Sequence, residues 1–226
     1  MGIVDGGLGI LDAAVIETKP LNVLLRPKLA GEFAPADYFR EMERNEICRG
    51  DRPLEVDLGC GDGSFLLEMA REFPERDFLG VERLLGRVKK VCKKLTRRRL
   101  ENMQVLRLDS RYVVEWLLPR ASVTRLHLLC PDPWPKLRHH RRRLVRAEFI
   151  EAVQRVLVPG GEFLFMTDHE EYFQWVAEKV AAFGKFEVLE WTEDTFFYPK
   201  TDFQEQWESE GKSMFRLRCR KSLNDA

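Results

Sequence analysis

The sequence predicts an α/β fold in which a doubly wound, mostly parallel sheet of seven strands carries helices on both faces. From Pro53 onward, short apolar runs alternate with longer stretches of helical periodicity, a pattern typical of successive βα units. The first apolar run leads directly into a glycine-rich turn and then into a helical pattern. Two late apolar runs, separated by a long segment without periodicity, complete the seven expected strands.

The first elements follow from local signals along the chain. Residues 54–58 form the first expected strand, which ends at the glycine-rich turn 59–63. Ser64 is expected to cap the next helix, because a serine hydroxyl can accept a backbone N–H of the first helical turn. The apolar face of that helix is expected to consist of Phe65, Leu66, Met69, Ala70 and Phe73.

The remaining elements continue the alternation of strands and helices. A very basic helix is expected between the second and third strands, and the turn Pro159-Gly160-Gly161 precedes the fifth strand. The other expected strands are residues 78–81, 103–108, 123–129, 162–166, 186–191 and 214–219, and further helices are expected at 145–157 and 171–183.

The chain is expected to contain one domain, residues 51–226, preceded by a partly irregular N-terminal extension, residues 1–50, with a helix near residues 35–48. Asp5 and Asp12 stand where a signal peptide would carry positive charge, and no apolar run approaches the roughly 20 residues of a membrane-spanning helix. The five cysteines and four histidines form no disulfide or zinc-binding pattern. These observations predict a cytoplasmic protein without a membrane segment or a bound metal.

The net charge of zero conceals a strong segregation of charge along the chain. Residues 83–146 contain 19 Lys and Arg but only four Asp and Glu, and residues 83–99 alone contain nine basic residues and no acidic one. Solvated helix faces also produce charge runs, but a run without acidic residues cannot form ion pairs within its own helix. The segment therefore favours an anionic partner.

The glycine-rich turn has the spacing of a nucleotide-cofactor site. Gly59, Gly61 and Gly63 lie between a strand and a helix, where glycine permits positive φ and lets a ligand approach the bare backbone. In the dinucleotide pattern Gly-X-Gly-X-X-Gly the third glycine would fall at Ser64. The observed Gly-X-Gly-X-Gly spacing instead resembles the first motif of class I S-adenosylmethionine-dependent methyltransferases. A nicotinamide-dependent oxidoreductase and a purely structural turn are the alternatives.

Two carboxylates at strand ends are placed to bind the same cofactor. Glu82 ends the second expected strand, 21 residues after Gly61, where it can accept both ribose hydroxyls of an adenosine. Asp109 ends the third expected strand and is placed to meet the adenine edge. No nearby Ser/Tyr/Lys set or histidine pair suggests hydride chemistry, so these residues favour a class I methyltransferase-like fold that binds S-adenosylmethionine.

A proline-rich loop follows the fourth expected strand, whose end borders the methyl-transfer position in this fold. The prolines stiffen the loop and would hold the carboxylate of Asp132 and the ring of Trp134 in set positions. A carboxylate can accept the N1 and N2 hydrogens of guanine, and an aromatic ring can stack on a base. The cations that follow, Arg138 and Arg141–Arg143, suit RNA phosphates. A rigid surface turn with a solvated basic tail is the alternative.

The whole segment 131–145, Pro-Asp-Pro-Trp-Pro-Lys-Leu-Arg-His-His-Arg-Arg-Arg-Leu-Val, is similar to the hallmark of the bacterial tRNA (guanine-N7)-methyltransferase family. The resemblance runs from about Pro53 to the C-terminus. It implies that the chain transfers a methyl group from S-adenosylmethionine to N7 of guanine 46 in the variable loop of tRNA.

The resemblance also implies roles for individual residues. In the family, the aspartate that matches Asp132 contacts the cofactor and is the active-site residue, and the lysine that matches Lys136 contacts the substrate. The late motif Thr-X-X-Glu matches Thr201 to Gln204. The expected cofactor-binding residues are thus Asp57, Gly59, Gly61, Glu82, Asp109 and Asp132, and the expected substrate-binding residues are Lys136, Arg138, Asp168, Thr201, Asp202, Phe203 and Gln204.

Some assignments stay open at the level of sequence. Gln204 replaces the glutamate of the family motif and brings no charge, and residues 83–87 lack the His and Pro of many members. Asp168 has helix capping as an alternative role. Asp132 is expected to orient the guanine and oppose its developing positive charge, with general base as the alternative. The sequence is compatible with a monomer and with a homodimer. Two other function classes also stay open: a nucleic-acid-binding protein without catalysis, and a methyltransferase that acts on a protein or a small molecule.

Overall fold

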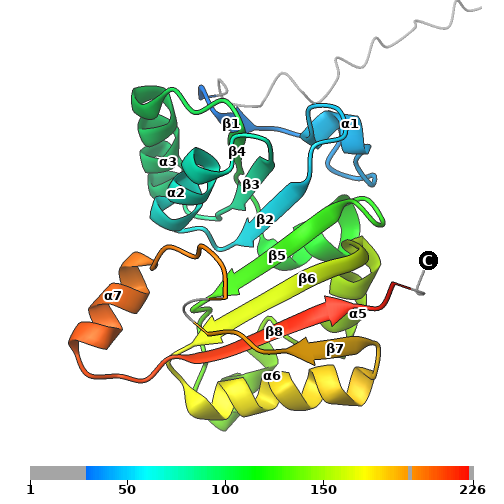
Figure 1. The fold of residues 1–226 in the computed structure, drawn as a ribbon, viewed down its shortest axis with the longest axis vertical. Coiled ribbons are helices and arrows are strands. Elements are labelled where there is room, and N and C mark those ends of the chain that lie inside the picture. The colour runs from blue at the N-terminus through cyan, green and yellow to red at the C-terminus, as the bar shows by residue number, and fades with distance from the viewer. Residues whose placement is uncertain (1–28, 193–194, 224–226) are drawn as a thin grey trace, which may run out of the picture.

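The computed structural model describes residues 29–192 and 195–223 and confirms the predicted α/β class (Figure 1). Within these residues, one sheet has the strand order β1-β4-β3-β2-β5-β6-β8-β7, in which β8 alone runs antiparallel to its neighbours. The seven expected strands are present, and β1 adds an eighth at one edge. The strands are β1 (Glu32–Phe33), β2 (Leu54–Leu58), β3 (Asp77–Val81), β4 (Met103–Leu106), β5 (Val123–Leu129), β6 (Leu157–Thr167), β7 (Phe186–Leu189) and β8 (Phe215–Lys221).

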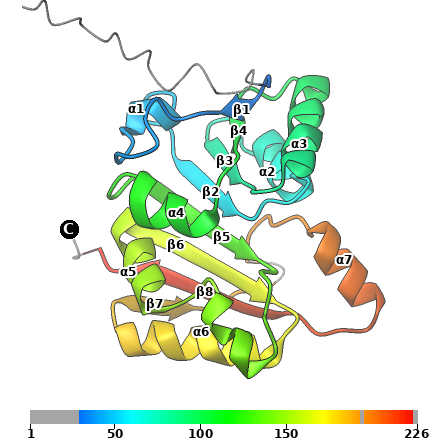
Figure 2. The same cartoon turned by 180° about the vertical axis from the view of Figure 1, so that it is seen from behind.

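Helices cover both faces of the sheet, as predicted (Figures 1 and 2). One hydrophobic cluster joins α2 and α3 to β3 and β4, and a second joins α5 and α6 to the opposite face of the central strands. The helices are α1 (Arg44–Ile47), α2 (Ser64–Glu72), α3 (Leu85–Arg98), α4 (Ser110–Tyr112, continued by a π-helical turn Val113–Leu117), α5 (Ala147–Val156), α6 (Glu170–Phe183) and α7 (Asp202–Ser209), with a 3₁₀ turn at Leu137–Arg142.

Three predicted features are wrong in detail. Gly63 rather than Ser64 precedes α2 as its N-cap, because the backbone turns there with a φ of 81°, and the side chain of Asp62 accepts the N–H of Ser64 at 3.1 Å. The helix expected near residues 35–48 is confined to the single turn α1. The long connection between β7 and β8 contains α7, which extends away from the sheet (Figure 1).

β6 begins before the Pro159-Gly160-Gly161 turn and passes through it. Val123 pairs with Leu157 and Arg125 pairs with Glu162, so the turn forms an irregularity within β6. A Cβ on Gly161 would lie 2.9 Å from the carbonyl oxygen of Val158 and within 3.2 Å of two carbonyls of β5. Only glycine permits this close approach of the two backbones.

The described part of residues 1–50 is attached to the sheet. β1 pairs with β4, and Phe33, Met42 and Ile47 are buried in the larger hydrophobic cluster. Residues 1–28 lie outside the described residues, so the boundary between extension and domain stays a prediction.

No helix in the described part of the chain is long and apolar enough to cross a membrane. Within residues 29–192 and 195–223, no three His, Cys, Asp or Glu side chains are grouped in a way that could hold a metal ion. The cytoplasmic location and the metal-free site remain predictions.

Candidate active site

The glycine-rich turn forms an open cradle at the carboxyl end of β2. The N–H groups of Gly59 and Cys60 both donate to the carbonyl oxygen of Val81, at 2.8 and 3.0 Å, which ties the turn to β3. Gly59 and Gly61 have φ values of 81° and 60°, and a Cβ on Gly59 would meet no atom within 4 Å. The turn therefore presents bare backbone to open space.

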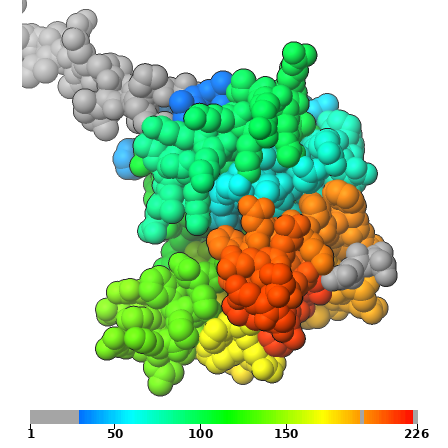
Figure 3. Space-filling model, turned by 90° about the vertical axis from the view of Figure 1, so that its left-hand side faces the viewer, coloured from blue at the N-terminus to red at the C-terminus, as the bar shows by residue number. Residues whose placement is uncertain are grey.

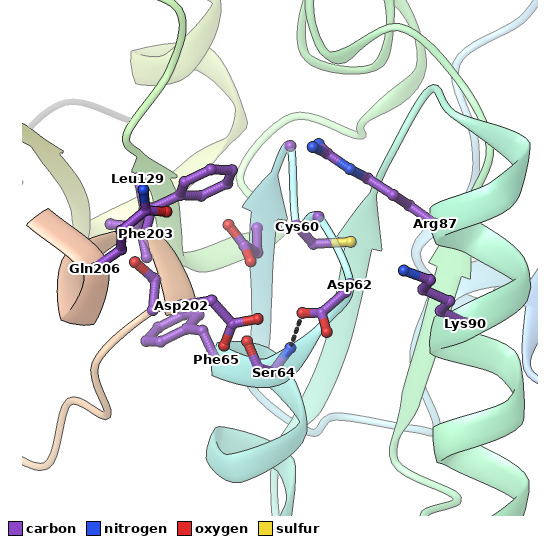
Figure 4. Close-up of a pocket in the computed structure, with 14 residues that line it drawn as sticks. Cys60, Asp62, Ser64, Phe65, Arg87, Lys90, Leu129, Asp202, Phe203 and Gln206 are labelled. Carbon is purple, nitrogen blue, oxygen red and sulfur yellow. Dashed lines mark hydrogen bonds between the residues drawn. The ribbon is translucent and has the colours of Figure 1, made fainter.

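A pocket of about 300 Å³ opens above this turn (Figure 4). Asp62, Ser64 and Phe65 form its floor, between α3 on one side and α7 on the other. Arg87 and Lys90, three residues apart, face it from α3. Its other lining residues are Asp57, Gly59, Cys60, Gly61, Leu129, Thr201, Asp202, Phe203 and Gln206.

A larger cavity of about 620 Å³ adjoins the first, since Gly59, Arg87, Leu129 and Phe203 line both. It extends along the carboxyl ends of β3, β4 and β5, where ligands bind in doubly wound sheets. Figure 3 shows this side of the molecule, with α3 in blue-green, α7 in orange-red and the 3₁₀ turn in yellow-green. The cavity brings together Glu82, Asp109, Asp132, Trp134, Arg141 and Arg142.

Two buried carboxylates lie at the end of this cleft beside the glycine-rich turn. Asp57 and Glu82 are only 3% and 5% exposed. Burial and the neighbouring Glu82 carboxylate raise the pKa of Asp57 to about 7. The Oε1 of Glu82 accepts the N–H of Leu84 at 2.7 Å, and Arg87 approaches its Oε2 at 3.5 Å. A cationic ligand above the turn would stabilise the ionised form of Asp57.

The residues of the cradle fit S-adenosylmethionine, which carries an ammonium and a sulfonium group beside an adenosine. The open space at Gly59 accommodates the ligand against bare backbone, and the carboxylates of Asp57 and Glu82 complement positive charge and hydroxyl groups. Asp109, three residues beyond β4, accepts the N–H groups of Arg111 and Tyr112 at 3.0 and 3.2 Å, which fixes its side chain as the N-cap of α4.

Replacing Glu82 by Ala should weaken S-adenosylmethionine binding by roughly ten- to a hundred-fold, because a charged hydrogen-bond acceptor costs about 1.5–3 kcal/mol to remove. Gly61→Val should also weaken binding, because its side chain would enter the pocket and its φ of 60° disfavours a branched residue. Calorimetric titration of the cofactor measures both effects. Gly86→Val is the matched control, since a Cβ there meets no atom within 4 Å and the residue lies outside both cavities. Unchanged affinity in both site variants would contradict the assignment.

The loop after β5, which carries Asp132, has an unusual backbone conformation on either side of that residue. Cys130 and Trp134 have φ values of 52° and 46°, a region that residues with a Cβ rarely adopt. The side chain of Asp132 is exposed to the larger cavity. The guanidinium of Arg142 lies 4.9 Å from the centre of the Trp134 ring, which places a cation beside an aromatic plane.

α7 contributes only part of the expected substrate set to the cleft. Thr201 caps α7 by accepting the N–H of Gln204 at 3.0 Å, and Thr201, Asp202 and Phe203 line the smaller pocket. Gln204 lines neither cavity, because it is buried and its amide donates to Glu208 at 2.7 Å.

The other expected substrate residues lie outside the two cavities. Lys136 and Arg138 are exposed on and beside the 3₁₀ turn. Asp168 lies 3.8 Å from the ammonium of Lys212, and the side chain of His169, not that of Asp168, caps α6.

Arg143 departs from the prediction that it holds an RNA phosphate. Its side chain is fully buried and forms an ion pair with Glu171, so it has no surface to offer a phosphate. The neighbouring Arg141 and Arg142 are exposed, as expected for phosphate ligands. The sequence alone does not distinguish the three arginines, because the partner that buries one of them lies 28 residues away.

A buried hydrogen-bond chain anchors the segment that leads into α7. The hydroxyl of Tyr198 lies 2.8 Å from Nδ1 of His127, and Nε2 of His127 lies 2.9 Å from the carboxylate of Glu55. Although burial opposes ionisation, the hydrogen bond from His127 and nearby cations lower the pKa of Glu55 to about 2. Burial lowers the pKa of His127. Through these hydrogen bonds Tyr198, three residues before Thr201, is tied to His127 of β5 and Glu55 of β2.

Comparison with known proteins agrees with this geometry. Residues 51–217 match the sequence profile of a family described as a putative methyltransferase. A tRNA (guanine-N(7)-)-methyltransferase of Syntrophotalea carbinolica is 32% identical over 211 residues, which span 92% of this chain and 87% of the relative. One of the same description from Rubrobacter xylanophilus is 34% identical over 82% of this chain and 86% of the relative.

Solved structures of methyltransferases share the fold. The 16S rRNA methyltransferase KamB matches 86% of this chain and 99% of its own with a TM-score of 0.59 and 18% identity. The aminoglycoside resistance methyltransferase NpmB1 matches 80% of this chain and 94% of its own with a TM-score of 0.56 and 20% identity. At these identities the structures establish the fold alone, whereas the sequence relatives establish the family. The chain belongs to the tRNA (guanine-N(7)-)-methyltransferase family.

Proposed function

We propose that this protein is an S-adenosylmethionine-dependent enzyme that methylates N7 of a guanine in tRNA, at position 46 of the variable loop. The observation that carries the proposal is one continuous cleft. Its cofactor end contains Gly59 and Glu82, and its other end contains Asp132 and Trp134 beside exposed arginines. The proposed cofactor site and the proposed base-binding loop would thus meet at the carboxyl end of β5.

In the proposed reaction, the protein aligns the guanine with the cofactor and stabilises the charge that develops during methyl transfer. S-adenosylmethionine supplies the methyl group on a sulfonium leaving group. Guanine N7 already carries a free lone pair, so no proton has to be removed before it reacts. Methylation places positive charge on the purine, and the carboxylate of Asp132 would oppose that charge as it develops. We therefore assign Asp132 an orienting and electrostatic role.

The cofactor is proposed to contact Asp57, Gly59, Gly61, Glu82, Asp109 and Asp132. Thr201, Asp202 and Phe203 are proposed to face the target nucleotide, because they line the cleft opposite α3. Gln204 is buried against Glu208, so we propose that it holds this segment in place without touching RNA. Lys136, Arg138 and Asp168 would contact the tRNA outside the cleft.

Exposed cations on both sides of the cleft are proposed to bind tRNA phosphates. Arg138, Arg141 and Arg142 flank the larger cavity on the 3₁₀ turn, and Lys90 faces the smaller pocket from α3. Three other cations of α3 already have acidic partners: Arg87 pairs with Glu82, Lys94 with Asp62 and Arg98 with Glu68.

Replacing Arg138, Arg141 and Arg142 by Gln should reduce the salt dependence of tRNA binding. Each phosphate contact contributes roughly 0.7–0.9 to the slope of log affinity against log salt concentration, so the triple variant should lose about two units of slope. Filter binding over a salt series measures this. Arg120→Gln with Lys185→Gln is the control, because both residues line a cavity on another part of the surface. An unchanged slope in the triple variant would place the RNA surface elsewhere.

The proposed function is tested by incubating the protein with unmodified tRNA and S-adenosylmethionine and mapping the modified nucleoside. We expect 7-methylguanosine at position 46, and no product when 7-deazaguanosine replaces that nucleotide, because the nucleophilic nitrogen is then missing. Methylation of a protein or small molecule, with tRNA inert, would favour the alternative methyltransferase classes. Cofactor and tRNA binding without methyl transfer would indicate a binding protein.

A further inference from the structure

The three consecutive arginines Arg141–Arg143 look alike in the sequence but differ in solvent exposure in the structure. Arg141 and Arg142 are exposed, whereas the side chain of Arg143 has 0% exposure. A buried guanidinium needs partners for its N–H groups, because it cannot be deprotonated. The contacts of Arg143 therefore show what it does for the molecule.

Arg143 joins the proline-rich loop to α6. Its Nε donates to the carbonyl oxygen of Pro133 at 2.9 Å. Its two terminal nitrogens donate to the two carboxylate oxygens of Glu171 on α6, one of them at 2.9 Å, in the fork geometry that arginine forms with carboxylates. The guanidinium also lies 4.9 and 5.2 Å from the ring centres of Tyr172 and Trp175.

The carbonyl that Arg143 binds lies between Asp132 and Trp134, both of which line the cleft. Three of the five residues from 131 to 135 are prolines, which have no N–H and cannot support the loop by donating hydrogen bonds. Cys130 and Trp134 adopt positive φ, a conformation that persists only when surrounding contacts enforce it. Arg143 is such a contact.

We infer that Arg143 is a positioning residue for Asp132: it fixes the loop through the Pro133 carbonyl, is itself oriented by Glu171, and binds no RNA phosphate. This inference rests on the proposed methyl transfer to tRNA. A lysine in its place keeps the charge but has no fork, so it cannot bridge the loop and the carboxylate in the same geometry.

The test is the single-turnover rate of methyl transfer by Arg143→Lys with saturating tRNA and cofactor. We expect the rate to fall roughly ten- to a hundred-fold, as misplacement of a catalytic group does. The salt slope of tRNA binding should stay at its wild-type value, because Arg143 contacts no phosphate. Arg141→Gln is the exposed neighbour for comparison, and it should lower the salt slope by roughly 0.7–0.9. A full rate for Arg143→Lys, or a salt slope that falls in Arg143→Gln as it does in Arg141→Gln, would overturn the inference.

A double-mutant cycle separates positioning of Asp132 from a general structural role. In the Asp132→Asn background, Arg143→Lys should change the rate less than about twofold, because the group that it positions is already disabled. Independent, multiplicative losses would overturn the inference. Glu171→Gln carries the same cycle if Arg143→Lys does not fold, because the glutamine amide oxygen can still accept one N–H of the buried Arg143 guanidinium while the two-pronged contact is lost. Absence of 7-methylguanosine with the wild-type protein would instead contradict the proposed function.

Discussion

Asp132→Asn is expected to slow the single-turnover methyl-transfer step by roughly a hundred- to a thousand-fold, the loss seen when one preorganised electrostatic contact is removed. The substitution keeps the shape of the side chain and removes the negative charge that faces the cleft. It also removes a strong acceptor for the N1 and N2 hydrogens of guanine. Asp132→Ala should be equally slow or slower.

The pH dependence of the same step separates the two roles of Asp132. If N7 needs no base, the wild-type rate should be nearly flat wherever the carboxylate stays ionised. Asp109→Asn is a useful comparison, because Asp109 lines the same cavity just beyond the end of β4. This substitution should weaken cofactor affinity more than it slows the chemical step. A full rate for Asp132→Asn would remove Asp132 from the mechanism. Rescue of that variant by small added bases would show that proton removal matters.

S-adenosylmethionine should bind about tenfold more tightly at pH 8 than at pH 6, because Asp57 has a pKa raised to about 7 by burial and by Glu82. A cationic ligand favours the ionised carboxylate, so binding below pH 7 must release a proton from Asp57 and weakens as the pH falls. Calorimetric titrations at several pH values, in buffers of different ionisation enthalpy, measure both the affinity and the proton release.

Asp57→Asn should abolish the pH dependence of cofactor affinity. It should also remove a pH dependence of folding stability that runs the other way, because the wild-type protein without cofactor loses stability as the pH rises. The pKa of Asp57 is higher in the folded than in the unfolded chain, so its contribution to stability is lost as the pH rises from about 4 through 7. In the wild-type protein without cofactor, the free energy of unfolding falls by up to about 4 kcal/mol. An asparagine at this position does not ionise, so the variant does not lose this stability. The Tm of Asp57→Asn relative to wild type should therefore rise with pH. A pH-independent difference in Tm, with cofactor affinity still dependent on pH, would show that another group titrates.

The sheet and the glycine-rich turn could be predicted because they depend on short-range sequence patterns. The apolar runs of β2 and β5 have the bounds expected from the sequence, since strands buried on both faces are continuously hydrophobic. The turn at Gly59 and the carboxylate of Glu82 follow directly from strand ends, and parallel strands bring their carboxyl ends to one edge. Such features require no knowledge of distant partners.

The missed features depend on tertiary contacts or lack a periodic signal. α7 has a single buried residue, Gln204, so it lacks the apolar stripe by which an amphipathic helix is recognised. β1 has two residues, too few for an alternating pattern. Arg143 is buried by Glu171 and by aromatic rings of α6, and no feature of its own segment indicates these partners.

The small buried area of α7 leaves this wall of the cleft free to diverge. Substitutions on a helix with one buried residue disturb little of the core, so their cost in folding free energy is small. The glycine-rich turn and β3 behind it are different, because a Cβ at Gly63 would lie 3.0 Å from Val91 and one at Gly80 would lie 2.8 Å from the sulfur of Cys60. Sequence drift can therefore change the α7 side of the cleft, which we propose faces the RNA, while the side proposed to bind the methyl donor stays nearly fixed. This is one physical route by which a single fold acquires many substrates.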